Sequence, residues 1–166
     1  KEMWIVSASF LALSFAAPAA ERAATPQGPD TLDISAYRIV GDKDDAKILR
    51  EHLERTGAYA PGEGAGVIEI ADDKSLPLEA MKVVVEDGRV AISGNPARWA
   101  VYEFLGQKIG VRFLWPGRLG TYVPQLKAIR IDRAAIDFRP ELLRRDFRQA
   151  GKPAAVLEWT DKHYLS

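Results

Sequence analysis

The sequence contains no cysteine, which excludes disulfide bonds, thiolate metal sites and cysteine nucleophiles. Its two histidines, His52 and His163, leave little material for a zinc site. Neither charge is in excess, because 23 Lys and Arg residues balance 23 Asp and Glu residues, whereas a nucleic-acid-binding domain normally carries a basic excess. There is no Gly-Lys-Ser/Thr phosphate loop, and the glycines of 62–66 precede a strand-like run rather than a helix. We therefore expect a loop at 62–66, and no cofactor, metal site or nucleic-acid partner.

The first part of the chain is an apolar run, Met3–Ala20, that ends in small residues. Its length and its end are typical of a secretory signal peptide with cleavage after Ala19. This pattern predicts a signal peptide over 1–19, a linker rich in Ala, Pro and Gly over 20–30, and export to the periplasm or the medium. A retained membrane anchor is the alternative, although three serines and Pro18 make the run a weak span. After cleavage we expect no contact with the membrane.

Hydrophobic residues make up 47% of the chain, which is enough for a core, and the length suits one domain. Residues 32–40 resemble one strand, with imperfect alternation. Asp44 or Asp45 is expected to cap the following helix, and Gly57 is expected to end it. His52 neighbours the apolar side of that helix, where we expect a structural or partly exposed histidine rather than a ligand.

A β-hairpin is expected over 81–93, because Asp87-Gly88 suits a two-residue turn with positive φ at both positions. With that turn, Glu86 faces Arg89 and Val85 faces Val90. The register places four apolar side chains on one face: Val83, Val85, Val90 and Ile92. It places polar side chains on the other: Lys82, Glu86, Arg89 and Ser93. The hairpin therefore predicts a sheet that is covered on one face only.

A helix followed by a strand is expected within Gly94–Gly117. Asn95 would cap the helix and Pro96 would take its first position. An apolar stripe at helical spacing follows: Ala97, Ala100, Val101, Phe104, Leu105 and Ile109. Gly110 is expected to end the helix, and residues 111–115 to form a strand. Residues 116–124 read as a loop and residues 128–132 as a short strand.

Taken together, these elements predict an α+β fold. The expected architecture is a two-layer sandwich, in which a small, mostly antiparallel sheet carries two helices packed on one face.

The central segment resembles a known family. Ala100–Leu105 and Gly110–Trp115, followed by a Pro-Gly loop that ends in Val123-Pro124, are similar to the small α/β domain that precedes the catalytic barrel in one group of enzymes. These are the α-glucuronidases, the β-N-acetylhexosaminidases and related bacterial glycoside hydrolases, many of unassigned activity. The resemblance extends roughly from Tyr37 to Phe147. Two departures are that Phe113 stands where the family often has tryptophan, and that the sequence stops where the barrel should begin.

The resemblance implies that residues 31–138 form a non-catalytic accessory domain. It implies that residues 139–166 are a connector and the start of a catalytic barrel, with Phe138 and Phe147 buried. The expected partner is that barrel, in the same polypeptide, and carbohydrate is a further possible ligand. The candidate residues for contact with the barrel or for stacking on sugars are Trp99, Arg112, Trp115, Tyr122, Phe147 and Arg148.

Glycosidic cleavage requires two carboxyl groups across the sugar. Asp72-Asp73 and Glu86-Asp87 are the candidate pairs, but solubility and turn chemistry explain both, and Glu103 is expected on the helix surface. Ser75, Ser93 and Thr121 have no histidine nearby in the sequence to support a hydrolase triad. We therefore expect no catalytic residue in this chain.

Two functions remain open from the sequence. The first is a non-catalytic N-terminal domain of an exported carbohydrate-degrading glycoside hydrolase. The second is a free-standing exported module that binds carbohydrate or a protein partner by itself, for which exposed Trp99, Trp115 or Tyr122 would be the indicator.

Overall fold

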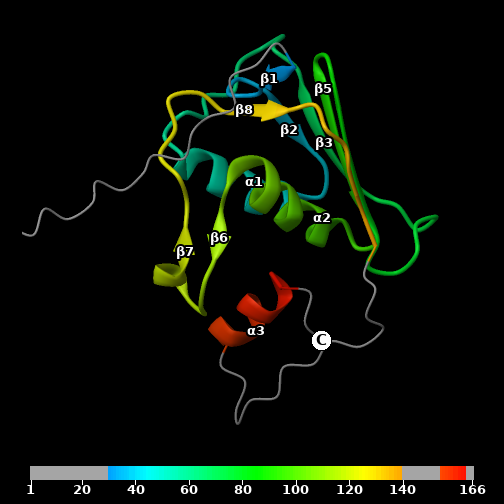
Figure 1. Cartoon of the computed structure of the whole chain (residues 1–166), viewed down its shortest axis with the longest axis vertical. Coiled ribbons are helices and arrows are strands. Elements are labelled where there is room, and N and C mark those ends of the chain that lie inside the picture. Colours follow the sequence, from blue (N-terminus) through cyan, green and yellow to red (C-terminus); the bar gives the residue numbers. More distant parts are fainter. Residues whose placement is uncertain (1–29, 140–153, 164–166) are drawn as a thin grey trace, which may run out of the picture.

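The structure is a computed structural model that describes residues 30–139 and 154–163 (Figure 1). The expected signal peptide, nearly all of the linker, and Phe147 and Arg148 of the expected connector lie outside the described residues. Within these two ranges, no helix combines the length and the apolar character needed to cross a membrane.

The largest sheet has five strands in the order β2-β3-β5-β4-β9. Their bounds are β2 Arg38–Val40, β3 Val67–Asp72, β5 Arg89–Gly94, β4 Met81–Glu86 and β9 Ile136–Phe138. The β2–β3 and β3–β5 pairs are parallel, and the β4–β5 and β4–β9 pairs are antiparallel. The described residues also form two small antiparallel sheets, so four of their six strand pairings are antiparallel.

The hairpin of β4 and β5 has the predicted register, with Glu86 opposite Arg89 and Val83 opposite Ile92. The turn itself differs from the prediction of positive φ at both central positions, because Gly88 has a φ of 74° but Asp87 does not have a positive φ. The apolar face is buried along both strands, while Lys82 and Arg89 on the other face are exposed. On the exposed face, the Arg89 guanidinium lies 2.7 Å from Glu69 of the neighbouring strand and 3.9 Å from Glu86. The sheet is thus covered on one side and solvated on the other, as the alternation predicts.

Two helices cover the apolar face, α1 (Lys43–Arg55) and α2 (Ala97–Phe104). Figure 1 shows both on the same side of the five-stranded sheet. Leu49 and Leu53 of α1 and Phe104 of α2 have no exposed surface. Burying one such side chain contributes about 1.5–3 kcal/mol. The predicted α+β class, with two helices on one face of a small sheet, is confirmed.

The capping residue of α1 is Asp42, not Asp44 or Asp45 as predicted. One Asp42 carboxylate oxygen accepts hydrogen bonds from the backbone N–H of Asp44 at 2.9 Å and of Asp45 at 3.4 Å. Asp45 is instead buried between the helices, where its carboxylate accepts from Nε of Arg98 on α2 at 2.9 Å. The predicted end of the helix is confirmed, since Gly57 has the positive φ of 76° that a terminating glycine adopts.

The start of α2 also differs from the prediction. Pro96 is the capping residue and makes no side-chain cap hydrogen bond, so it does not occupy the first helical position. The side-chain amide of Asn95 donates to the Leu76 carbonyl at 2.9 Å instead of capping the helix. The acceptor for the first helical N–H, that of Ala97, is Asp72 at the end of β3, at 2.7 Å. The cap therefore comes from a neighbouring strand.

A single π-helical turn, η1 (Leu105–Ile109), continues α2 and ends at Gly110, whose φ is 83°. The stop at Gly110 is confirmed. The Lys108 ammonium on this turn donates to the Asp132 carboxylate at 2.5 Å and to the Ala134 carbonyl at 2.6 Å. These bonds tie the helical layer to the strand that precedes β9.

The remaining strands are shorter than predicted. The single strand expected over 32–40 divides into β1 (Thr31–Asp33) and β2, because the Asp33 carboxylate accepts from the Ser35 N–H in a turn between them. β1 pairs with β8 (Arg130–Asp132), which forms within the predicted strand 128–132. The strand expected over 111–115 is reduced to β6 (Arg112–Phe113).

The loop expected over 116–124 contains a 3-10 turn, η2 (Arg118–Gly120), and the strand β7 (Thr121–Tyr122). β7 pairs with β6, and the two strands form the third sheet. The glycines of 62–66 form a loop, as predicted. The last described element is the helix α3 (Ala154–Asp161).

Replacing Asp72 tests the cap supplied by β3. We expect Asp72→Ala to lower the free energy of unfolding by about 1 kcal/mol, because the Ala97 N–H loses its acceptor. Denaturant unfolding followed by circular dichroism measures this loss. Asp72→Asn keeps an oxygen acceptor and serves as the control, so equal stabilities for the alanine and asparagine variants would contradict the cap.

Candidate functional site

Among the described residues, several aromatic side chains cluster around Phe113 of β6. The Phe113 ring makes edge-on contacts with Tyr102 of α2 at a centroid distance of 5.5 Å and with His52 of α1 at 5.7 Å. His163, directly after α3, approaches the same ring at 6.4 Å. Such edge-to-face pairs are each worth about 0.5–1.5 kcal/mol beyond the area they bury. Phe113 therefore joins elements that are far apart in the sequence.

Two indole N–H groups connect α3 to this aromatic cluster. Nε1 of Trp159 donates to the Phe113 carbonyl at 3.2 Å, and Nε1 of Trp99 on α2 donates to the Asp161 carboxylate at 3.1 Å. The Lys162 ammonium lies 5.2 Å from the centre of the Phe113 ring, within the range of a cation–π contact.

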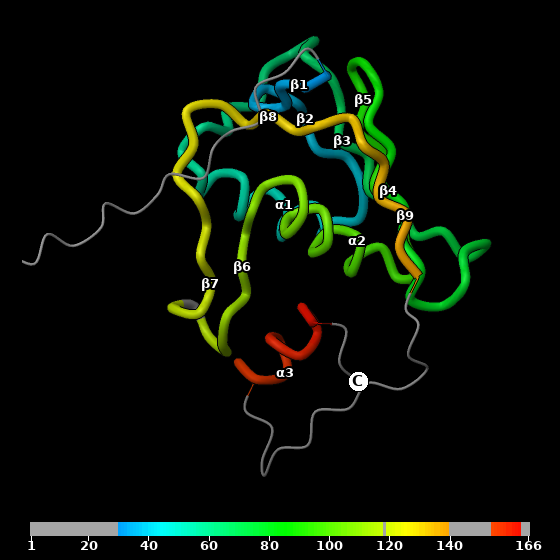
Figure 2. Tube along the Cα trace, viewed as in Figure 1, coloured from blue at the N-terminus to red at the C-terminus, as the bar shows by residue number. Residues whose placement is uncertain are grey.

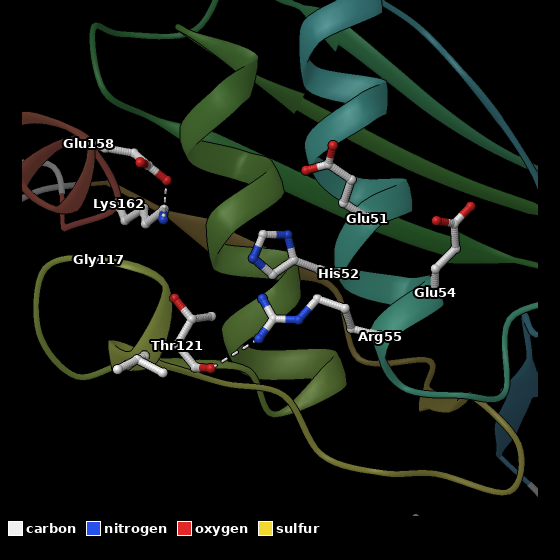
Figure 3. A pocket seen from close by; sticks show the side chains of 9 residues that line it. Glu51, His52, Glu54, Arg55, Gly117, Thr121, Glu158 and Lys162 are labelled. Atoms are coloured by element: carbon white, nitrogen blue, oxygen red, sulfur yellow. Dashed lines mark hydrogen bonds and ion pairs between the residues drawn. The ribbon is translucent and has the colours of Figure 1, made fainter. Parts of the chain in front are cut away.

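An open cleft of about 920 Å³ lies between α1, the turn that joins β6 to β7, and α3 (Figure 3). Most of the residues that line it are of charged or polar type: Glu51, His52, Glu54, Arg55, Gly117, Leu119, Thr121, Glu158 and Lys162. Arg55 reaches from α1 across the cleft to donate to the Thr121 carbonyl at 3.2 Å. Lys162 and Glu158 form an ion pair of 2.6 Å on its other side.

His52 lies at the inner edge of the cleft. Burial lowers its pKa below the ordinary value of 6.5, and the cations Arg55 and Lys162 lower it further. The hydrogen bond from Nδ1 to the Ile48 carbonyl at 2.8 Å and the nearby Glu51 carboxylate act in the opposite direction but do not prevail. The ring is thus held neutral in a packed position, in agreement with the predicted structural role.

The carboxylates considered for catalysis have structural hydrogen bonds. Asp72 caps α2, and Asp73 accepts from the Ser75 N–H at 2.9 Å and from its hydroxyl at 2.5 Å, which lowers the pKa of Asp73. Asp87 pairs with Arg133 at 2.5 Å, and Glu103 accepts from Gln107.

Three other carboxylates border the cleft, and the sequence reasoning did not single them out for catalysis: Glu51, Glu54 and Glu158. Glu51 lies 3.8 Å from Lys47 of the same helix, and Glu158 pairs with Lys162. Both side chains are well exposed. A glycosidic general acid is instead held in apolar surroundings away from water.

The structure separates the candidate interface residues into two locations. Trp99 is half-buried beside α3, whereas the Trp115 and Tyr122 side chains are 54% and 49% exposed on the β6–β7 hairpin. Arg112 is exposed and donates to the Gly106 carbonyl at 3.0 Å, which braces the turn after α2. Phe138 is partly buried against the core.

The role of Phe113 as the centre of this arrangement was not predicted, and neither were those of Trp159 and Lys162. The residues that contact Phe113 come from three separate segments, α1, α2 and 154–163, so no local pattern marks it. Across 30–139 and 154–163, no three His, Asp or Glu side chains lie close enough together to hold a metal ion.

No family model and no curated protein matches the sequence. Among solved structures, the chain is similar to a GH20 exo-β-N-acetylglucosaminidase from Vibrio harveyi in complex with N-acetylglucosamine, at 18% identity and a TM-score of 0.47. It is also similar to an inactive mutant of that enzyme, at 17% identity and the same TM-score. Each alignment covers 74% of this chain and 18% of the other, so the chain spans less than a fifth of the length of these enzymes.

The environment of His52 predicts a pH dependence of stability. Because the pKa of His52 is lower in the folded state, the unfolded state takes up the proton first, and the free energy of unfolding falls as the pH drops below about 6.5. We expect His52→Gln to remove this part of the acid destabilisation. Chemical unfolding at several values between pH 8 and 5 measures it, and an unchanged slope below pH 6.5 in the variant would contradict the assignment.

Proposed function

We propose that residues 31–138 are a non-catalytic accessory domain of an exported, carbohydrate-degrading glycoside hydrolase, placed before a catalytic barrel in the same polypeptide. The resemblance of the segment Gly94–Gly117 to the N-terminal domains of such enzymes supports this family. In the structure this segment forms α2, η1 and β6, which run from the core to the aromatic cluster. The proposed enzyme class rests on this sequence resemblance.

The observation that carries the non-catalytic role is the engagement of the candidate carboxylates. Asp72, Asp73 and Asp87 are committed to a helix cap, a turn and an ion pair, respectively. The carboxylates that border the cleft, those of Glu51, Glu54 and Glu158, are exposed to solvent. Engaged and exposed carboxylates of this kind favour a domain that positions a neighbouring domain. They do not favour an acid–base pair for glycosidic cleavage within this domain.

Export is part of the proposal and rests on the sequence of the first twenty residues. The apolar run Met3–Ala20 has the length and the small-residue end of a signal peptide. A chain without cysteine needs no particular redox environment to fold, so it suits the periplasm and the medium equally well.

The exposed aromatic side chains of the β6–β7 hairpin favour a second candidate function, carbohydrate binding by the domain itself. Trp115 and Tyr122 present apolar surface to solvent next to Leu114, which is 56% exposed. Rings in such positions can stack on the faces of sugar rings. The same surface could equally contact a neighbouring domain.

The accessory role predicts no hydrolytic activity. We expect the purified chain to leave aryl β-N-acetylglucosaminides and aryl α-glucuronides intact, because Asp72, Asp73 and Asp87 are engaged in structural hydrogen bonds and an ion pair. Release of the aryl alcohol, measured by absorbance, detects turnover. Hydrolysis above a heat-denatured control would contradict the non-catalytic role.

Glycan binding distinguishes the two candidate functions. If the domain binds carbohydrate by itself, Trp115→Ala and Tyr122→Ala should each abolish retention on immobilised polysaccharide, with stability changed by about 0.5 kcal/mol or less at these exposed positions. Trp99→Ala is the matched control, since Trp99 lies beside α3 instead. We expect the wild-type chain not to be retained. Specific retention that depends on Trp115 would favour the second function.

A further inference from the structure

We propose that α3 is a docking element that attaches the C-terminal segment of this chain to the face made by α1, α2 and β6, called here the docking face. The docking face is defined by His52, Trp99, Tyr102 and Phe113, and its occupant is residues 154–163 of the same chain. The inference deepens the proposed function and rests on it: the domain would be joined to its catalytic neighbour through this face, and not through the exposed side chains of Trp115 and Tyr122. Figure 2 shows α3 beside the helical layer, away from the five-stranded sheet.

Hydrogen bonds run across this contact in both directions. The body donates from Trp99 to Asp161, and α3 donates back from Trp159 to the Phe113 carbonyl. An indole N–H can only donate a hydrogen bond. Each of these two bonds therefore requires an acceptor oxygen at a defined position on the opposite element. Two such bonds fix both the position and the rotation of α3 on the docking face.

Ring and cation contacts surround the two hydrogen bonds. His163 lies against Trp159, with ring centroids 4.2 Å apart, and its edge meets Phe113. The Lys162 side chain is only 12% exposed, because it lies over the Phe113 ring while its ammonium pairs with Glu158. A long charged side chain that buries its stem in this way adds apolar contact as well as charge.

The burial pattern of α3 is one-sided. Val156 is 9% exposed, whereas the adjacent Leu157 is 48% exposed. A helix this short has little stability by itself in water, so its order depends on the side that is covered. The contacts of the covered side with the docking face, and not the helix propensity, therefore determine whether residues 154–163 stay helical and docked.

Phe113 of β6 belongs to this contact, but Trp115 and Tyr122 of the β6–β7 hairpin lie outside it. About half of the surface of Trp115 and Tyr122 is open to solvent, and the Leu119 side chain is 87% exposed at the rim of the cleft. The candidate interface residues thus belong to two different surfaces. Trp99 lies on the docking face, while Trp115 and Tyr122 remain accessible to another ligand.

Hydrogen exchange of the indole N–H groups, measured by NMR on the full chain, tests the docking directly. We expect the indole protons of Trp99 and Trp159 to exchange about tenfold or more slowly than that of Trp115, which is exposed. Asp161→Ala should raise the exchange rate of the Trp99 indole, whereas Asp161→Asn keeps an oxygen acceptor and should preserve much of its protection. Equal exchange of Trp99 and Trp115 in the wild-type chain would overturn the inference.

A second pair of variants separates docking from folding. Val156→Asp places a charge on the covered side of α3 and should release both indole protections, while the backbone amides of the β4–β5 hairpin stay protected. Leu157→Asp is the matched control on the exposed side and should leave all protections unchanged. If Val156→Asp leaves the indoles protected, or also unfolds the hairpin, α3 is not a separable docking element.

These outcomes are distinct from a failure of the proposed function. If α3 is undocked in a chain that does continue into a catalytic barrel, the docking inference fails and the accessory role stands. If α3 is docked in a polypeptide that has no catalytic domain, the accessory role fails and the contact of α3 with the docking face stands.

Discussion

The structure depends on one requirement, that the apolar face of the five-stranded sheet be removed from water. β5 lies in the middle of this sheet and leads directly into α2, the helix with the most extensive packing on that face. Val90 and Ile92 of β5 and Phe104 of α2 are buried completely or almost so. Because β5 and the helix α2 that covers it are consecutive in the chain, they can pack together by closing a short loop, which costs little chain entropy. The second helix, the small sheets and the docking face are arranged around this unit.

Charged side chains hold the outer elements to the core unit. The Asp45–Arg98 pair lies between α1 and α2, with the Asp45 side chain 10% exposed. The Lys108 ammonium is nearly buried and donates a hydrogen bond to the Asp132 carboxylate. This bond lowers the pKa of the Asp132 carboxyl. Pairs of this kind contribute less than their geometry suggests, because desolvation offsets the attraction, but loss of one partner leaves the other uncompensated. They specify where α1 and β8 lie rather than supplying most of the stability.

Local signals in the sequence predicted the parts of the fold that depend on neighbouring residues. The Asp87-Gly88 turn determined the hairpin register, and Gly57 and Gly110 marked the helix ends, because each signal lies within a few residues of its effect. The caps could not be predicted in the same way. The acceptor for the Ala97 N–H comes from Asp72, 25 residues earlier, and is adjacent only once β3 and β5 have paired.

The candidate site shows the same limit. Exposed Trp115 and Tyr122 were recognised as interaction candidates from residue type alone, whereas the centre of the arrangement, Phe113, was not. Its partners lie on α1, α2 and α3, and these contacts exist only in the folded chain. The position of Glu51 at the cleft was not predicted either, because the cleft also needs the β6–β7 turn and α3, which lie far from Glu51 in the sequence.

The central claim is that this body supports a larger catalytic neighbour in the same polypeptide. The most direct measurement is to read the encoding DNA beyond the codon for Ser166. The account predicts an open frame of several hundred residues with alternating strand and helix patterns, as in a catalytic barrel of eight strand–helix units. A stop codon within a few residues of Ser166 would contradict it.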